Sequence, residues 1–180
     1  MGINTLRQVL TLSLVFALSA PALLAESAGG VNWTAPDGWT SQPKRMRAAN
    51  YVVPAAGGDS EGGECGIYFF GPGQGGSVEA NVRRWIGQFR APDGSPADSL
   101  AKRATETING IPVTTIDLTG TYLSKPFPMA QQVTPKPGYR MLAAIAEAPQ
   151  GPVFFKLTAP KTTTAAAEAT FRAMLNSLKK

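Results

Sequence analysis

The sequence contains no histidine, and Cys65 is its only cysteine. A Ser-His-Asp triad, a Cys-His pair, a structural zinc site and an intrachain disulfide are therefore excluded by composition. The twelve acidic residues are scattered and form no D-x-D-x-D run, so they do not indicate a metal site. From these absences we expect no catalytic residue, no metal and no cofactor. Cys65 precedes the apolar run GIYFF and is expected to be buried, with a reactive thiol or an intermolecular link as the alternatives.

Long apolar runs are missing beyond the first segment of the chain. There, Arg7 is followed by VLTLSLVFALSAPALLA, which ends in small residues near Ala25. A basic start, an apolar centre and a small-residue exit are typical of a cleaved secretory signal peptide, and Pro21 argues against a membrane anchor. The protein is then secreted or periplasmic, without stable membrane insertion. We predict three parts: a signal peptide (1–25), a flexible lead-in (26–30) and a single domain (31–180).

Charge is sparse and only slightly basic. The chain has 17 basic and 12 acidic residues and a net charge of +5. This excess is too dilute to indicate nucleic acid as a partner. The densest basic cluster is KRMR at residues 44–47, which either forms a solvated strand edge or binds an anion.

Two segments have the periodicity of amphipathic helices. The first follows Ser77, a good N-cap, and is expected to end near Pro92, with Glu79 placed to pair with Arg83 at i, i+4. The second follows Pro160, with threonines 162–164 available for capping. The apolar faces consist of Val78, Val82, Trp85, Ile86 and Phe89 in the first helix, and of Ala167, Phe171, Met174, Leu175 and Leu178 in the second.

Between these helices the sequence predicts two β-hairpins. Asn109-Gly110 joins KRATETI to IPVTTIDLTGTYL, and a Pro-Gln-Gly turn at residues 149–151 joins YRMLAAIAEA to PVFFKLTA. Further strands precede the first helix. The expected fold is therefore α+β, with an antiparallel sheet of about six to seven strands covered by two amphipathic helices.

The glycines of residues 71–76 satisfy the G-x-G-x-x-G spacing of a dinucleotide-binding loop. The surrounding sequence contradicts that function, because a hairpin follows where a parallel βαβ unit is required. Pro72 lacks a backbone donor, and Asp93 and Asp98, at the spacing of a ribose ligand, lie in an expected loop. There is no Lys-Ser or Lys-Thr pair of a Walker loop either. We interpret the glycines as a sharp turn from strand to helix.

One candidate binding surface lies on the first helix. Asn81, Arg84 and Gln88 line one flank of its apolar face, next to Trp85. This row is either a partner-binding strip, a solvated flank, or a structural clasp for the glycine turn.

A second candidate surface is the proline-rich connection SKPFPMAQQVTPKPG, residues 124–138, which carries Phe127 and Met129. Long loops of this kind often bind partners. The alternative is a rigid loop that tucks Phe127 against the edge of the domain.

Three segments carry a resemblance to known proteins: TAPDGWTSQPKRMRAANYVVP, FGPGQGGSVEANVRRWIGQF and GPVFFKLTAPKTTTAAAEATFRAMLNSL. They are similar to a group of exported bacterial proteins of unknown function. The element order and the P-x-G-W entry motif at residues 36–39 also resemble the Mog1/PsbP-like α/β/α sandwich. That resemblance implies an antiparallel sheet between helices and a binding or assembly role, and no functional residue carries over from it.

The leading functional hypothesis is an exported, non-enzymatic binding or accessory protein with an unknown protein or small-molecule partner. One alternative is a small-molecule carrier with a pocket between sheet and helix. Another is an enzyme that uses tyrosines and carboxylates. The residues considered for such an enzyme are Tyr68, Tyr122, Tyr139, Glu64, Asp117 and Glu147.

Overall fold

The computed structural model describes residues 25–127 and 130–180. All of the predicted signal peptide except Ala25 lies outside the described residues, as does Met129. The elements in chain order are β1 (Ala25–Ala28), β2 (Val31–Thr34), β3 (Thr40–Ser41), β4 (Ala49–Val53), β5 (Gly63–Tyr68), α1 (Val78–Ile86), β6 (Phe89–Arg90), a short 3-10 helix (Asp98–Leu100), β7 (Lys102–Ile108), β8 (Ile111–Ser124), β9 (Thr134–Ala148), β10 (Gly151–Pro160) and α2 (Lys161–Asn176).

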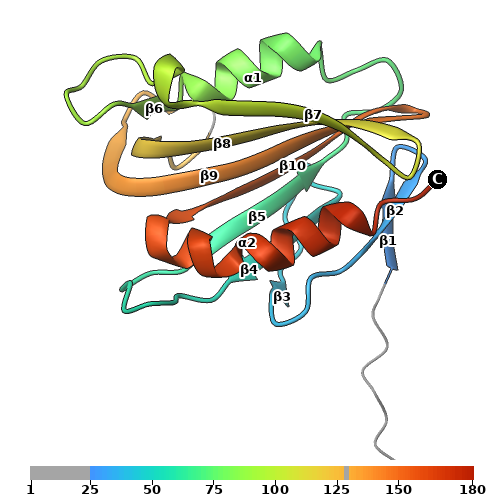
Figure 1. The fold of residues 1–180 in the computed structure, drawn as a ribbon, viewed down its shortest axis with the longest axis horizontal. Coiled ribbons are helices and arrows are strands. Elements are labelled where there is room, and N and C mark those ends of the chain that lie inside the picture. The colour runs from blue at the N-terminus through green and yellow to red at the C-terminus, as the bar shows by residue number, and fades with distance from the viewer. Residues whose placement is uncertain (1–24, 128–129) are drawn as a thin grey trace, which may run out of the picture.

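The described residues form an eight-stranded antiparallel sheet with helices on both faces (Figure 1). Its strand order is β3-β4-β5-β10-β9-β8, and β6 and β7 pair with different stretches of β8. β1 and β2 form a separate two-stranded ribbon. The α+β architecture predicted from the sequence is confirmed. The sheet has more strands than expected because β3 and β6 are only two residues long and carry no periodic signal.

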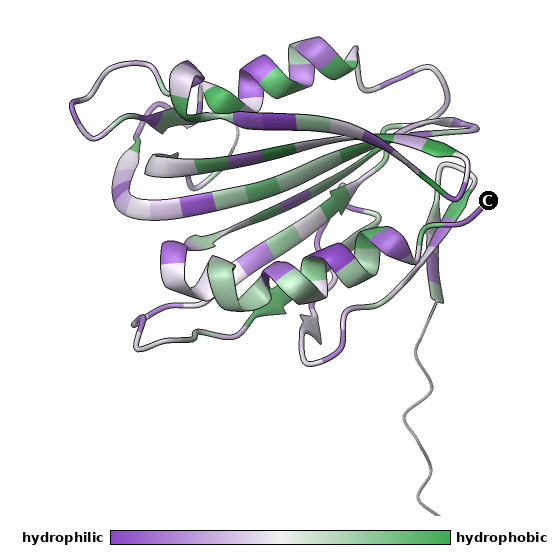
Figure 2. Cartoon of the chain, in the orientation of Figure 1, coloured by the Kyte–Doolittle hydropathy of each residue, from purple (hydrophilic) through white to green (hydrophobic). Residues whose placement is uncertain are grey.

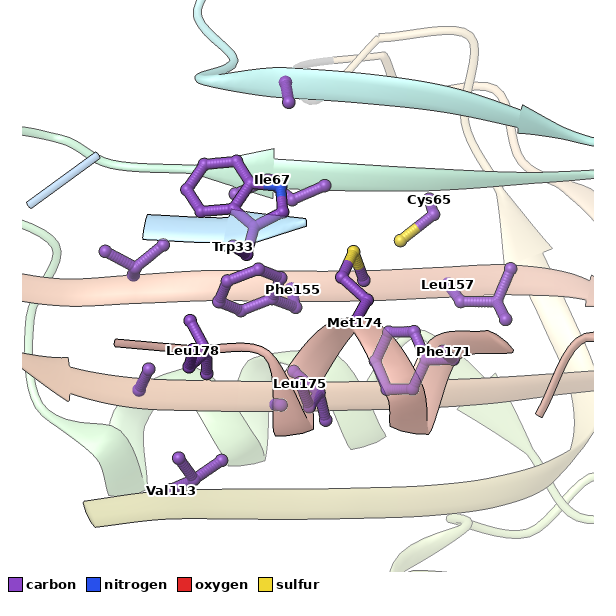
Figure 3. Packing of buried hydrophobic residues seen from close by; sticks show 14 of the residues in the cluster. Trp33, Cys65, Ile67, Val113, Phe155, Leu157, Phe171, Met174, Leu175 and Leu178 are labelled. Atoms are coloured by element: carbon purple, nitrogen blue, oxygen red, sulfur yellow. The ribbon is translucent and has the colours of Figure 1, made fainter. Parts of the chain in front are cut away.

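Two apolar cores lie on the two faces of the sheet. Strand residues that alternate along β8, β9 and β10 pack in turn against α2 and against α1, which is the period-two pattern of a sheet buried on both sides. Figure 3 shows the core under α2, where Phe171, Met174 and Leu178 lie in one apolar cluster with Trp33 and Phe155. Hydrophobic and hydrophilic residues alternate along both helices (Figure 2), as a helix with one buried face requires.

The core under α2 contains Cys65, which is fully buried. Its thiol has a pKa raised by burial, so it carries little thiolate. The expectation of a small buried side chain is confirmed, and the reactive-thiol alternative is not supported.

α1 begins as predicted but ends earlier. The Ser77 hydroxyl accepts a hydrogen bond from the Ala80 N–H at 3.2 Å, and Gly87 follows the last helical residue. Phe89 therefore does not extend the helical face; it lies in β6 and pairs with Tyr122. Phe89 is still fully buried, because β6 pairs with β8 and places this side chain in the same apolar core as the buried face of α1. Periodicity alone does not distinguish these two ways of burying one side chain.

The expected pairing of Glu79 with Arg83 is wrong. Glu79 instead accepts from Arg103 on β7, at 2.6 Å. Both side chains are largely exposed, and a partner from another strand replaces the neighbour one helical turn away. The ion pair therefore links α1 to the edge of the sheet.

The start of α2 differs from the prediction in a similar way. Pro160 occupies the N-cap position without a side-chain cap. Thr164 turns back to the carbonyls of Ala159 and Pro160 at 3.2 and 3.0 Å. The cap comes from Asp59, which accepts from Thr163 across 104 residues of sequence. A cap that distant leaves no local signal.

The connection expected over residues 124–138 is shorter in the structure. β9 begins at Thr134 and pairs with the end of β8, so that Leu123 faces Pro135. β10 has ended at this point, since Pro160 pairs with Tyr139. This arm of β9 has a free edge, where prolines are tolerated in a strand. In the sequence these prolines indicate a loop, because the sequence does not show which residues lie at the free edge of a strand.

The segment expected to be a flexible lead-in is a strand. Glu26 pairs with Trp33 across a tight turn at Gly29 and Gly30, both with positive φ. Two glycines with left-handed backbone match the turn of a two-residue hairpin. Separately, no helix among the described residues has the length and apolar character needed to cross a membrane.

Candidate binding site

The turn between β5 and α1 depends on glycines whose backbone is left-handed. Gly71, Gly73, Gly75 and Gly76 all have positive φ, a conformation that residues with a Cβ rarely adopt. β5 pairs antiparallel with both β4 and β10, so the parallel unit of a dinucleotide fold is absent here, within the described chain. The interpretation as a strand-to-helix turn is supported.

Asn81 is the clasp of this turn. Its Nδ2 donates to the carbonyls of Gly75 and Ser77 at 2.7 and 2.9 Å, and its Oδ1 accepts from Arg84 at 2.5 Å. The side chain is only 4 % exposed. Of the three interpretations of the helix flank, the clasp is the one that describes Asn81. Arg84 is exposed and is fixed in place by this bond.

The remaining sequence-predicted residues fall in different environments. Trp85 is 3 % exposed and packs edge-on against Phe154, at 6.1 Å between ring centroids, so a partner does not reach it in this arrangement. Gln88 is half-buried and its Oε1 accepts from the Lys156 amine. Phe127 is 60 % exposed on the β8–β9 connection, a separate element from α1, and is not tucked against the domain. Met129 lies outside the described residues.

An open groove of about 540 Å³ runs along the glycine turn. Its walls are residues 74–76, Phe70, Ala80, Asn81 and Arg84. Phe70 is 43 % exposed and stacks on Tyr68 with 6.2 Å between ring centroids. The groove thus has an aromatic wall and a guanidinium wall, and the stacking of Phe70 on Tyr68 places it beside the end of β5 in the sheet.

Polar side chains gather on the sheet, on the same side as α1. We call this surface the basic face. It consists of Lys44, Arg47, Arg84, Lys136 and Lys156, the tyrosines Tyr68, Tyr122 and Tyr139, and the carboxylates Glu61 and Glu64.

Glu64 holds one corner of the basic face. Lys44 and Arg47 both bind its carboxylate, the latter at 2.5 Å, and the Arg47 guanidinium lies 5.1 Å above the centre of the Tyr68 ring. Burial alone would raise the pKa of Glu64, but its bonds to the two cations outweigh that effect and lower the pKa. The carboxylate is therefore ionised and already occupied.

Gly66 forms the floor beneath this corner. A Cβ at this position would lie 2.8 Å from the Tyr68 Oη and 3.0 Å from an Arg47 nitrogen. The absence of a side chain lets the tyrosine and the arginine lie flat on the strand. Here glycine is required for close approach and not for an unusual φ.

Lys156 lies at the centre of the basic face, on β10 between Gly66 and Ala143. The residue is half-buried, whereas its amine is densely surrounded: it donates to Gln88 and lies 5.4 Å from the centre of the Tyr122 ring. Burial and the nearby guanidiniums lower the pKa of Lys156 to about 7.

The opposite corner is built around Tyr139. Tyr122 stacks on it at 5.9 Å, and the Lys136 amine donates to its hydroxyl at 3.1 Å and to Glu61 at 2.7 Å. Burial raises the pKa of both tyrosines. The bond from Lys136 lowers the pKa of Glu61.

The structure therefore gathers part of the set considered for a tyrosine-carboxylate enzyme. Tyr68, Tyr122 and Tyr139 share one face with Glu64. Asp117 points to the other face, where Arg140 bridges it to Glu168 on α2, and Glu147 is exposed. Within the described residues, no group of three cysteine, aspartate or glutamate side chains could hold a metal ion.

Sequence reasoning missed the central residue of this site, Lys156. Its signal is a single charge inside the apolar run VFFKLTA, which indicates an amine that a strand carries into a half-buried surface. The part played by Gly66 leaves no comparable signal, because any strand glycine looks alike in the sequence.

The fold is an α+β sandwich like that of PsbP, and in this chain one side of its sheet carries a basic, aromatic face. The chain is similar to cyanobacterial PsbP (CyanoP) from Synechocystis sp. PCC 6803, with a TM-score of 0.52 and 12 % identity over 93 % of this chain and 98 % of that one. It is also similar to PA94 from Pseudomonas aeruginosa, a protein of unknown function described as a putative regulator, with a TM-score of 0.47, 14 % identity and coverage of 87 % and 96 %. No protein-family model and no curated protein matches the sequence.

Proposed function

We propose that this chain is an exported, non-enzymatic accessory protein that binds an acidic segment of a partner protein across its basic face and the adjoining groove. Export is inferred from the apolar first segment and its small-residue exit. The PsbP-like fold is compatible with such a role but does not identify a partner.

The observation that carries the proposal is the convergence of five cations on one face against two carboxylates. Lys44 and Arg47 come from the β3–β4 connection, Arg84 from α1, Lys136 from β9 and Lys156 from β10. Segments this far apart in the sequence produce a positive surface despite a net charge of only +5. A surface of one sign favours a partner of the other sign and speeds their encounter.

An exposed aromatic side chain in the groove supports a protein partner over the non-specific binding of small anions. Phe70 is exposed beside Arg84 and continues the stacked rings of the basic face. Aromatic residues and arginine are the side chains most enriched at protein interfaces, where both supply large contact areas. An acidic segment with an apolar side chain fits such a groove.

The pKa shifts of the tyrosines and carboxylates on the basic face argue against acid–base catalysis by these five groups; Lys156, with a pKa of about 7, is the exception. A general acid or base works best with a pKa near the working pH. Glu61 and Glu64 have pKa values below their usual range, and Tyr68, Tyr122 and Tyr139 have values above theirs. The shifts move the pKa values of these five groups further from neutral pH. They are the shifts expected of a network of ion pairs around partly buried tyrosines.

The available volumes favour a partner over an enclosed small molecule. A space of about 180 Å³ lies between the sheet and α2, beside Phe171 and Leu175. Small-molecule sites usually enclose about 300–1,000 Å³. The larger groove beside Phe70 is open to solvent and suits an extended chain better than a captured ligand.

Site-specific photocrosslinking in cells tests the proposal. A photoreactive phenylalanine analogue is placed at Phe70 in the groove, at Phe127 on the other candidate surface, and at Arg172 on exposed α2 as a control. We expect a defined adduct from position 70 and none from position 172. An adduct at position 127 alone would overturn the proposed surface.

A matched pair of variants gives the crosslink its specificity. Arg84→Ala removes a charge from the groove, whereas Arg83→Ala removes the same charge from the neighbouring exposed position of α1. We expect the adduct at Phe70 to fall at least fivefold with Arg84→Ala and to persist with Arg83→Ala. Equal adduct yields in both variants would contradict the proposal.

A further inference from the structure

We propose that Arg84 and Lys156 form a carboxylate-binding subsite, occupied by an aspartate or glutamate of the partner's acidic segment. This inference rests on the proposed function and specifies the chemistry of its central contact.

Arg84 and Lys156 differ from the other cations of the basic face. Lys44, Arg47 and Lys136 are each paired with a glutamate. Arg84 and Lys156 instead donate to neutral amide oxygens, those of Asn81 and Gln88. In the described part of the chain, neither of them lies within salt-bridge distance of a carboxylate. Arg84 also acts electrostatically on the Lys156 amine, so two cations influence each other where the described residues supply neither of them with a carboxylate partner.

The surroundings of the Lys156 amine explain why this arrangement is unfavourable without a ligand. Gly66 on β5 and Ala143 on β9 flank it and contribute no polar side chain. Tyr122 offers its ring from β8, and Gln88 offers an amide oxygen from the end of α1.

Three charged groups act on the amine from neighbouring elements. Arg84 on α1 and Arg47 before β4 repel it, and Glu64 on β5 attracts it. Two cations and one carboxylate already held by other cations leave a net repulsion. Together with burial, this repulsion brings the pKa of Lys156 to about 7.

A carboxylate bound between Arg84 and Lys156 would reverse this balance. A guanidinium and an ammonium can each donate to a carboxylate, with short charge-assisted bonds. The added negative charge would raise the pKa of Lys156 toward its ordinary value, so the bound state would hold the proton. Because linkage is reciprocal, a ligand that favours the protonated amine must bind more tightly where the amine is already protonated.

The direction of the pH dependence follows. Below pH 7 Lys156 is already charged, and affinity is at its full value. Above pH 7 each binding event must take up a proton, so the dissociation constant rises by about tenfold per pH unit. Glu64 is ionised throughout this range because its pKa is lowered, and the tyrosines stay protonated because theirs are raised.

Titration calorimetry with a hexaglutamate peptide tests the subsite at pH 6.0 and pH 8.5 and constant ionic strength. We expect the wild-type protein to bind about thirtyfold more weakly at pH 8.5, with uptake of one proton when buffers of different ionisation enthalpy are compared. A dissociation constant that is equal at the two pH values would overturn the inference.

Variants separate the two cations. Lys156→Arg keeps the charge without titrating, so it should bind equally well at both pH values; Lys156→Met should bind weakly at both. Arg84→Gln should weaken binding at least tenfold at pH 6.0, and the control Arg83→Gln less than twofold. A wild-type pH slope in Lys156→Arg would refute the role of Lys156. Inorganic phosphate binding with the same variant pattern and higher affinity would show a phosphate site in place of a carboxylate subsite.

The two proposals can fail independently. If the peptide does not bind while the crosslink from position 70 depends on Arg84, the subsite is wrong and the partner surface stands. If the peptide binds with the expected pH slope but position 70 gives no adduct, the subsite stands and the proposed protein partner is wrong.

Discussion

The Asp59 carboxylate accepts two hydrogen bonds from Thr163, one from its backbone N–H at 2.7 Å and one from its hydroxyl at 2.8 Å. The same hydroxyl accepts from the Ala56 N–H at 3.1 Å, and Thr163 is fully buried. The loop between β4 and β5 thereby satisfies one of the free backbone donors at the start of α2, the Thr163 N–H, and places a negative charge at the positive end of the helix. It replaces the local side-chain cap that Pro160 does not provide.

Asp59→Ala should therefore destabilise the protein. Loss of an N-cap side chain costs about 1–2 kcal/mol of unfolding free energy, and here the Thr163 hydroxyl also loses its acceptor. Urea denaturation measures the loss. Asp37→Ala is the matched control, since Asp37 is exposed and, among the residues that the structure describes, bonds only the Gly38 N–H of its own turn. The cap would be of no importance if both variants unfolded at the wild-type urea concentration.

Asn81→Ala should loosen the glycine turn and weaken the fold. It leaves the carbonyls of Gly75 and Ser77 without their donor and releases Arg84, at a cost of about 1–3 kcal/mol for buried groups that lose partners. Hydrogen exchange of residues 71–76 should accelerate more than that of β9. Glu79→Ala, which removes an exposed ion pair from the same helix, should leave this exchange unchanged. Unaltered exchange in Asn81→Ala would mean that the turn holds itself.

Gly66→Ala should alter the basic face more than it alters stability. The new methyl group displaces the Tyr68 hydroxyl and Arg47, both of which are movable side-chain ends. Because Arg47 lowers the pKa of Lys156, its displacement should raise that pKa above about 7. NMR titration of the Lys156 Cε–Hε signals measures the change.

Gly87→Ala is the control for this substitution. Gly87 has helical φ, and a Cβ there has the Arg83 carbonyl as its nearest neighbour, at 3.3 Å. Its titration curve for Lys156 should match that of the wild type. Identical curves for Gly66→Ala and the wild type would show that Arg47 has no influence on the amine.

Lys156 should make stability depend on pH in a defined window. Its pKa is about 7 in the folded protein and near 10.5 when unfolded, so between these values the unfolded chain binds more protons. The wild-type free energy of unfolding should therefore rise with pH above 7, by about 2 kcal/mol up to pH 9. Below pH 7 the unfavourable charge is fully present in the folded state.

Lys156→Met should abolish this increase and should be the more stable protein at pH 6, because a buried charge is replaced by an apolar chain of similar length. Urea denaturation at four pH values between 6 and 9 measures both effects. Parallel pH curves for the two proteins would assign the increase to other groups.

The sequence was sufficient for those parts of the fold that depend on local patterns. The period of 3.6 residues identified both helices, and Asn109-Gly110 identified the β7–β8 hairpin, where both residues have positive φ. Local patterns were not sufficient where one residue fits two kinds of secondary structure. Phe89 fits a helical face and also a buried strand, and Pro135 fits a loop and also a free strand edge.

The candidate site was predicted only in part for the same reason. Arg84 and Gln88 belong to the surface that the structure assembles, because helical spacing places them on one flank. Trp85 lies next to that flank, on the apolar face, and is buried, and Asn81 is turned inward by bonds to backbone carbonyls. Helical geometry gives the direction of a side chain, whereas the neighbouring turn decides whether it reaches solvent.

The sequence by itself determined the class of this protein: an α+β domain without histidine, with two amphipathic helices and paired strands, following a segment typical of export. These properties depend on composition and on short-range periodicity. Only the tertiary structure brought Arg47, Arg84 and Lys156 together, because they come from three elements separated by up to 109 positions. The electrostatic character of a site depends on distances between charges, and those distances are set by strand order and by a floor at Gly66 that a side chain would fill.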